Sequence, residues 1–276
     1  MQLEVISRRP KGAAQATPLL FVHGAYGGAW IWEEHFLPYF AERGYAAYAL
    51  SLRGHGRSEG RERLAFARLG DYVADVERVM ADLDRPPVLI GHSMGGMVVQ
   101  KVLHRRRLPA AVLMASAPPH GMVPSLFGMI WTDPGLFWDL AMMEAAGADG
   151  TASPSVRRAL FSPGVPDAEV DRYMRRFRAE SIAVILDLMG LDLPPSTPCL
   201  DIPVLVLGAE DDHFVFPGAV AETARTYRTE GEIFQGMAHA MMVDRRWRDV
   251  AERIAEWLST ALAARGHRRP SAVQSA

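Results

Sequence analysis

The chain has 276 residues, of which 49% are hydrophobic and 22% are charged, and its formal net charge is −2. This composition is typical of a globular protein with a substantial core. It argues against binding to nucleic acid, which needs a concentration of basic side chains. No apolar run approaches the roughly 18 residues of a membrane-spanning helix, and the single cysteine, Cys199, excludes an internal disulfide. We therefore expect a cytoplasmic protein with one large domain, with or without an insertion.

Short apolar runs recur along the chain, each followed by turn residues and a helical pattern. Most of these runs are unbroken rather than alternating, which is typical of strands covered on both faces. Helical patterns fall at residues 71–83, 94–107 and 247–263. The alternation predicts an α/β fold, a mostly parallel central sheet flanked by helices. The predicted strands are residues 18–22, 46–52, 87–90, 110–115, 203–207 and 232–234, with an antiparallel strand at 3–6.

This rhythm breaks between about residues 118 and 203, which contain no strand pattern but helical patterns such as residues 168–189. We interpret residues 118–199 as a helical cap inserted into a core formed by residues 1–117 and 200–276. The cap is rich in large apolar side chains. Most of these are expected to form the cap's own core, and others to line a hydrophobic pocket. The candidates for substrate binding are Tyr26 in the core and Met122, Phe127, Trp131 and Trp138 in the cap.

The segment Gly91-His92-Ser93-Met94-Gly95 follows a predicted strand and precedes a predicted helix. In this context the pattern G-x-S-x-G indicates a nucleophile elbow, a sharp strand-to-helix turn that exposes the serine hydroxyl. The glycines are needed because a Cβ atom at either position would clash with the neighbouring strand or helix. The alternative is that Ser93 is simply a polar residue in a tight turn.

A serine nucleophile needs a base, which in turn is oriented by a carboxylate. His239 follows the last predicted strand and is the candidate base. Asp211 follows the strand at 203–207 and is the preferred acid, although its neighbours Glu210 and Asp212 could fill the same role. The reaction also needs N–H donors for an oxyanion. The candidates are Met94, directly after the nucleophile, and Ala25, in the glycine-rich loop after the strand at 18–22.

These motifs together resemble the α/β-hydrolase fold superfamily, in its serine esterase and lipase-like branch. The resemblance rests on His23-Gly24, on the stretch from Leu52 to Ser58, on Gly91–Gly95, and on Gly208-x-x-Asp211 and Gly236-x-x-His239. It implies the fold, the Ser-Asp-His triad and a cap after the sixth strand. A local match, His23-Gly-Ala-x-x-Gly-Ala-Trp30, is similar to the plant methylesterase and hydroxynitrile lyase group. The related lyases carry a lysine after the catalytic histidine, and Ala240 stands there in this chain.

The predicted activity is hydrolysis of a carboxylic ester with an apolar acyl or aromatic group, through an acyl-enzyme on Ser93. The alternatives are thioesterase, amidase, C–C bond hydrolase or perhydrolase chemistry, or a non-catalytic member of the fold that binds a small molecule. No dinucleotide, Walker-type or His-Glu-x-x-His motif is present, so we expect no cofactor and no metal. The expected partner is a small acyl substrate. The sequence does not determine the oligomeric state.

Overall fold

The computed structural model describes residues 1–146, 153–195 and 202–266. Cys199, the C-terminal tail from residue 267 and the expected boundary between cap and core at residues 199–200 lie outside these ranges. None of the helices within them is both long and apolar enough to span a membrane.

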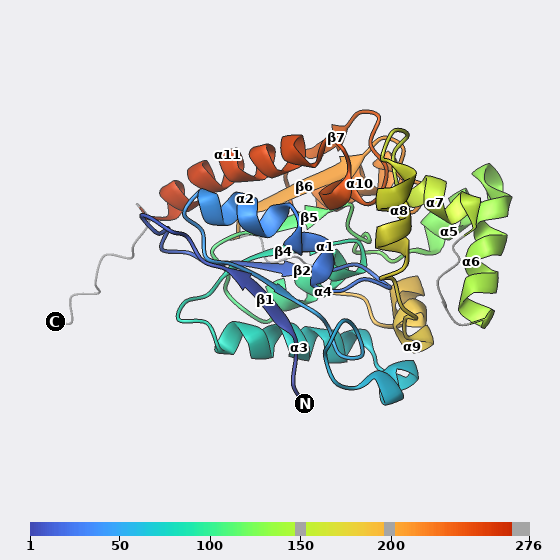
Figure 1. Cartoon of the computed structure of the whole chain (residues 1–276), viewed down its shortest axis with the longest axis horizontal. Coiled ribbons are helices and arrows are strands. Elements are labelled where there is room, and N and C mark those ends of the chain that lie inside the picture. Colours follow the sequence, from blue (N-terminus) through green and yellow to red (C-terminus); the bar gives the residue numbers. More distant parts are fainter. Residues whose placement is uncertain (147–152, 196–201, 267–276) are drawn as a thin grey trace.

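The centre of the molecule is a seven-stranded sheet in the order β1-β3-β2-β4-β5-β6-β7 (Figure 1). Only β1 pairs antiparallel, with β3, and all other pairs are parallel. The predicted α/β fold and its antiparallel first strand are therefore confirmed. The strands are β1 (Val5–Arg8), β2 (Leu19–Val22), β3 (Ala47–Leu50), β4 (Val88–His92), β5 (Ala111–Met114), β6 (Val204–Ala209) and β7 (Gly231–Phe234).

Helices cover both faces of this sheet, which explains why its central strands are largely apolar. Every residue of β2, β4, β5 and β6 is buried. One face packs against α1 (Trp30–Glu33), α2 (Phe36–Glu42) and α11 (Trp247–Gly266). The other packs against α3 (Leu69–Ala81), α4 (Met94–Leu103) and α10 (Pro217–Thr226). Side chains of β2 alternate between the two cores, Leu19 and Phe21 facing one and Leu20 and Val22 the other.

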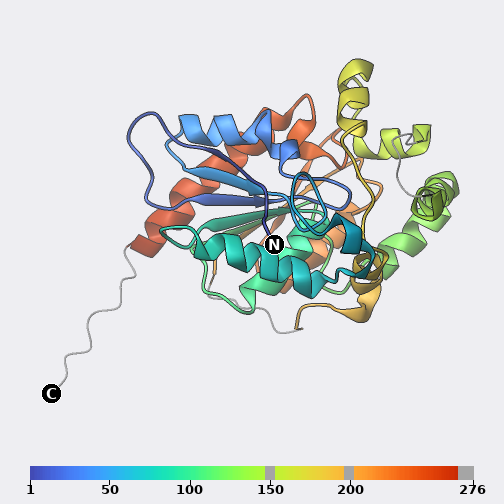
Figure 2. The ribbon, with the colours of Figure 1, turned by 60° about the horizontal axis from the view of Figure 1, so that its bottom comes forward.

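The inserted segment between β5 and β6 is helical in its described part. It comprises α5 (Val123–Thr132), α6 (Pro134–Ala146), α7 (Pro154–Leu160), α8 (Asp167–Met174), α9 (Ile182–Leu186) and a π-helical turn at Asp187–Leu191. Figures 1 and 2 show these helices grouped beyond one end of the strands. The insertion thus follows the fifth strand, not the sixth as the resemblance implied, because a single antiparallel strand precedes the parallel part of this sheet.

The helical pattern at residues 168–189 does not form one helix. It divides into α8 and α9, which are separated by residues 175–181. Ser181 begins the second helix, because its hydroxyl accepts a hydrogen bond from the Val184 N–H at 3.4 Å. Two of the intervening residues, Arg178 and Glu180, bond instead to the core loop after β2, at Tyr26.

Candidate active site

Ser93 lies between β4 and α4 with backbone angles φ = 53° and ψ = −121°. Non-glycine residues rarely adopt a positive φ, and a strained serine at this junction has the geometry of a nucleophile elbow. The backbone around it is held on both sides: the Ser93 N–H donates to Met114 of β5 at 3.1 Å, and the Ser93 carbonyl accepts from Ala117 at 3.0 Å.

The two flanking glycines are required by close packing, as predicted. A Cβ atom at Gly91 would lie 2.5 Å from the carbonyl oxygen of Gly95, at the start of α4. A Cβ atom at Gly95 would lie 2.4 Å from the carbonyl oxygen of His23, just beyond β2. Helix α4 can approach the sheet closely only because both positions lack a side chain.

His239 lies in the loop after β7 and is almost completely buried. Its Nδ1 atom is 2.7 Å from Oδ2 of Asp212. A carboxylate oxygen can only accept, so in the neutral ring the proton is on Nδ1, and Nε2 keeps its lone pair. His239 and Ser93 line the same cavity. The histidine therefore has the protonation pattern that a general base requires.

The carboxylate beside His239 belongs to Asp212 and not to Asp211, the residue preferred from the sequence. Asp211 is exposed, and its backbone N–H donates to the Met237 carbonyl at 2.9 Å. The side chain of Asp212 is fully buried, and its Oδ1 accepts from the N–H groups of Phe214 and Val215 at 2.8 Å each. Strand β6 runs two residues past its predicted end, and the turn after it directs the second aspartate inward.

His92 is a further residue of this site, and the sequence pattern alone gives it no role. It precedes Ser93, is buried, and its Nε2 atom lies 2.9 Å from the carbonyl oxygen of His239. This pairing requires Nε2–H as the donor, so His92 ties the loop of the base to the nucleophile elbow. Burial, together with the nearby His239, places the pKa of His92 well below the usual histidine value, which keeps the ring uncharged.

The two residues predicted to supply the oxyanion donors, Ala25 and Met94, both line the cavity beside Ser93. Ala25 lies in the loop after β2, and Met94 is the first residue of α4. This is the arrangement in which two backbone N–H groups can face an oxygen that is bound to the serine.

The cavity has a volume of about 380 Å³ and extends from Ser93 under the inserted helices. Its wall is overwhelmingly apolar, and the predicted binding residues Tyr26 and Met122 belong to it. Side chains from α5 to α9 complete it. They include Leu126, Met129, Phe137, Leu140, Leu160 and Ile185.

Three predicted pocket residues are not in the cavity wall, which corrects the prediction. The exposed fractions are 67% for Phe127, 90% for Trp131 and 64% for Trp138. Helices α5 and α6 are apolar on both faces, so the sequence pattern gives no signal for which face turns inward. The inward-facing residues of α5, Leu126 and Met129, are one or two positions away from the outward-facing ones.

Within the described ranges, no group of three or more histidine, cysteine or acidic side chains is arranged to hold a metal ion. The polar groups at the cavity include a serine with a positive φ and a histidine that is paired with a buried carboxylate.

A family model described as "Alpha/beta hydrolase family" matches residues 19–253. The chain belongs to the alpha/beta hydrolase family. This confirms the superfamily that the motifs resemble. The non-heme haloperoxidase of Rhodococcus erythropolis is 27% identical over 255 residues, which cover 81% of this chain and 86% of that protein.

Two further similarities agree with this membership. Salicylic acid-binding protein 2 of Nicotiana tabacum is 30% identical over 112 residues, which cover 39% of this chain and 42% of that protein. The monoacylglycerol lipase of Paleococcus ferrophilus has the same fold, with a TM-score of 0.68 at 21% identity over 95% of this chain and 100% of that one.

Proposed function

We propose that the chain is a serine hydrolase that cleaves carboxylic esters with apolar acyl or aromatic groups. Ser93 is the nucleophile, His239 the base and Asp212 the acid. The observation that carries the proposal is the Asp212–His239 pair at 2.7 Å, in one apolar cavity with a strained Ser93. Residues 1–117 and 200–276 form the catalytic core in this proposal, and residues 118–199 are its cap.

The proposed reaction begins when the Ser93 hydroxyl attacks the ester carbonyl and His239 Nε2 accepts its proton. Asp212 stabilises the resulting imidazolium. The N–H groups of Ala25 and Met94 bind the oxyanion of the tetrahedral intermediate. His239 then protonates the departing alcohol. A water molecule, deprotonated by the same histidine, releases the acid from the acyl-enzyme.

The apolar wall supports the proposed substrate class. A cavity that offers few hydrogen-bonding groups beyond the catalytic residues favours a hydrocarbon chain or ring over a polar acyl group, because buried polar groups without partners cost free energy. The cavity of about 380 Å³ is at the small end of typical ligand pockets, which suits a single acyl or aromatic group.

Perhydrolysis is a second candidate, favoured by the similarity to the haloperoxidase of Rhodococcus erythropolis. In this reaction hydrogen peroxide replaces water as the acceptor of the acyl group, and the product is a peracid. The same serine, base and oxyanion donors serve both reactions.

The test compares wild type with Ser93→Ala on p-nitrophenyl esters of increasing chain length. Labelling of the serine by a fluorophosphonate is measured in parallel. We expect stoichiometric labelling and hydrolysis that favours apolar acyl groups, both lost in the variant, with kcat lower by about 10⁴-fold or more. Labelling without turnover of any ester would contradict the ester proposal. Absence of labelling would indicate a binding protein. Halogenation supported by acetate and hydrogen peroxide, lost in Ser93→Ala, would favour perhydrolysis.

A further inference from the structure

The backbone of Tyr26 is held by the segment that connects α8 to α9. Tyr26 directly follows Ala25, the candidate oxyanion donor, and has a positive φ of 64°. Its carbonyl accepts a hydrogen bond from the Arg178 N–H at 2.9 Å. Its N–H donates to Oε2 of Glu180 at 3.3 Å. The backbone N–H and the backbone carbonyl of Tyr26 are therefore both bonded to residues of the inserted segment.

The Glu180 carboxylate is buried, and it joins three parts of the molecule. Oε1 accepts from the Tyr72 hydroxyl of α3 and, at 2.8 Å, from the Ser181 N–H at the start of α9. Oε2 accepts from Tyr26 and lies 3.2 Å from Nε2 of His55, in the loop after β3. The His55 contact is an ion pair whose angle is not that of a linear hydrogen bond.

His55 faces an acceptor on each side of its ring. Its Nδ1 atom lies 3.0 Å from the Arg53 carbonyl oxygen, and its Nε2 atom faces the Glu180 carboxylate. Neither acceptor can donate, so the surroundings of the ring favour a proton on each nitrogen, which is the imidazolium form. Burial opposes this charge, but Glu180 outweighs it and raises the pKa of His55. Burial likewise opposes the charge of Glu180, but His55, Tyr72 and the Ser181 N–H together lower its pKa.

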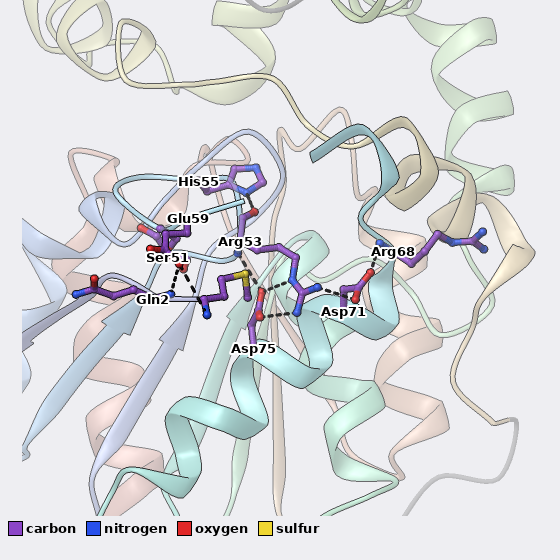
Figure 3. Close-up of polar contacts among 10 residues, drawn as sticks. Gln2, Ser51, Arg53, His55, Glu59, Arg68, Asp71 and Asp75 are labelled. Atoms are coloured by element: carbon purple, nitrogen blue, oxygen red, sulfur yellow. Dashed lines mark hydrogen bonds and ion pairs between the residues drawn. The ribbon is translucent and has the colours of Figure 1, made fainter. Parts of the chain in front are cut away.

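The other titratable groups around Glu180 and His55 do not offset the charge of the Glu180 carboxylate. His23 lies with its ring centre 5.2 Å from that of His55, and burial and the His55 charge lower its pKa to about 3, so it is uncharged. Burial and Glu180 raise the pKa of Tyr72, which stays a hydroxyl donor. Arg53 uses its guanidinium on Asp75 and Asp71 of α3, and His55 points away from it (Figure 3). The imidazolium of His55 is therefore the ionic partner that offsets the Glu180 charge.

We infer that Glu180 is a positioning residue of the oxyanion hole, an inference that rests on the proposed function. The ion pair with His55 fixes the carboxylate beneath the loop. The carboxylate fixes the Ala25–Tyr26 peptide, which adjoins the Ala25 N–H, and the Arg178 N–H fixes the following Tyr26–Gly27 peptide. The segment that connects α8 to α9 thereby sets the orientation of a group that stabilises the transition state in the proposed reaction. Because the pair carries no net charge, it fixes the loop without placing an uncompensated anion near the oxyanion.

The test variant is Glu180→Gln, which keeps the size of the side chain and removes its charge. The loop is then less firmly oriented, and small misplacements of catalytic groups carry large rate costs. We expect the rate of Ser93 labelling by a fluorophosphonate, and kcat on a p-nitrophenyl ester, to fall by about 10- to 100-fold. KM should change by less than about twofold, since the cavity wall is intact.

Two inhibitors separate positioning from a general loss of structure. A trifluoromethyl ketone adds to the serine and forms an oxyanion, whereas the corresponding alcohol binds without forming one. Glu180→Gln should weaken binding of the ketone by about the same factor as it lowers kcat/KM. It should leave binding of the alcohol unchanged. A purely structural effect would weaken both compounds.

The matched control is Asp75→Asn, which removes another buried carboxylate paired with a cation of the same loop, Arg53 (Figure 3). It should lower the melting temperature and leave the labelling rate within about twofold of wild type. If Glu180→Gln does not fold, Tyr72→Phe replaces it, since this change removes a single donor to the carboxylate. We expect it to slow labelling by about threefold to tenfold.

The outcomes distinguish this inference from the proposed function. If the wild type is labelled and Glu180→Gln or Tyr72→Phe is labelled at the same rate, the positioning role is overturned and the hydrolase proposal stays intact. Equal losses for Glu180→Gln and Asp75→Asn also overturn it. If wild type is not labelled at all, the proposed function fails, and the positioning role fails with it.

Discussion

Asp211 and Asp212 are adjacent in sequence, but their surroundings differ. Asp211 is exposed to water, where a carboxylate is well solvated. Asp212 is buried, and both of its oxygens have N–H partners: Phe214 and Val215 on one and His239 on the other. These donors fix the direction of the carboxylate. The carboxylate can therefore hold His239 in one tautomer and orientation.

Asparagine substitutions of the two aspartates should separate their roles. In Asp212→Asn the side chain can donate as well as accept, so it no longer enforces the proton on Nδ1 of His239. We expect kcat to fall by about 10⁴-fold with a small change in KM. Asp211→Asn should stay within about twofold of wild type. Steady-state kinetics on one p-nitrophenyl ester measures both. A larger loss of kcat in Asp211→Asn than in Asp212→Asn would assign the role of the acid to Asp211.

The sequence was sufficient to select Ser93 and His239, which line one cavity, but not to determine which aspartate pairs with the histidine. The serine lies in a pattern whose glycines are needed for packing, and the histidine lies in the loop after the last strand. Three consecutive acidic residues follow β6, and their spacing does not determine which one the turn directs inward. The choice depends on the two backbone N–H groups at Phe214 and Val215, which only the folded turn places around Asp212.

Helix α5 has two apolar stripes with different surroundings. Leu126 and Met129, together with Met122 just before the helix, face the cavity, whereas Phe127 and Trp131 are exposed. Both sets repeat at helical spacing. The sequence therefore predicts a helix but not its rotation, which depends on where the helix meets the core. The sequence likewise does not predict the break between α8 and α9. Residues 175–181 are not helical, and Arg178 and Glu180 among them bond to the loop at Tyr26.

Adjacent positions on α5 offer a matched test of the cavity wall. Leu126→Trp should fill space beneath the helix and shift the preference toward shorter acyl groups. We expect kcat/KM to fall by about tenfold or more for a long-chain p-nitrophenyl ester and to change little for the acetate. Phe127→Trp places the same side chain outside the cavity and should leave the chain-length profile unchanged. Identical profiles for the two variants would contradict this assignment of the faces.

Across the whole molecule, the parallel sheet brings the site together. Ala25 follows β2, Ser93 follows β4, Asp212 follows β6 and His239 follows β7. Parallel strands end at one edge of a sheet, so residues more than 200 positions apart meet there. The fold class and the convergence of these loops could be predicted because they depend only on the alternation of apolar strands and helices. The contacts of the inserted segment could not, because they depend on side chains distant in sequence.

Buried neutral histidines make the stability of the whole molecule depend on pH. The pKa of His23 is lowered to about 3 by burial and by the His55 charge, and that of His92 is also far below the usual value of 6.5. Between pH 6.5 and 4.5 the unfolded chain therefore binds protons that the folded chain does not. Near pH 5.5, in the middle of this window, His55, whose pKa is raised, is protonated in both states, and Glu180, whose pKa is lowered, is ionised in both. The slope there comes chiefly from His23 and His92, and His35 and His104, whose pKa values are also lowered by burial, act in the same direction.

The free energy of unfolding should thus decrease as the pH falls from 6.5 to 4.5. Each histidine contributes up to about 1.4 kcal/mol per pH unit, and the two together up to about 2.7 kcal/mol per unit. Urea unfolding at half-unit intervals, followed by tryptophan fluorescence, measures this slope. Stability that is constant or that rises on acidification would contradict it.

A His92→Gln variant tests the assignment, because glutamine does not titrate and can still donate to the His239 carbonyl. Its absolute stability differs from that of wild type, so the informative quantity is the slope. We expect it to be smaller by about 1.4 kcal/mol per pH unit, the contribution of one proton. An unchanged slope would mean that His92 is as readily protonated in the folded chain as in the unfolded one. A charged ring could still donate to the carbonyl, but it would place a positive charge beside His239 and oppose formation of the imidazolium that the proposed reaction requires.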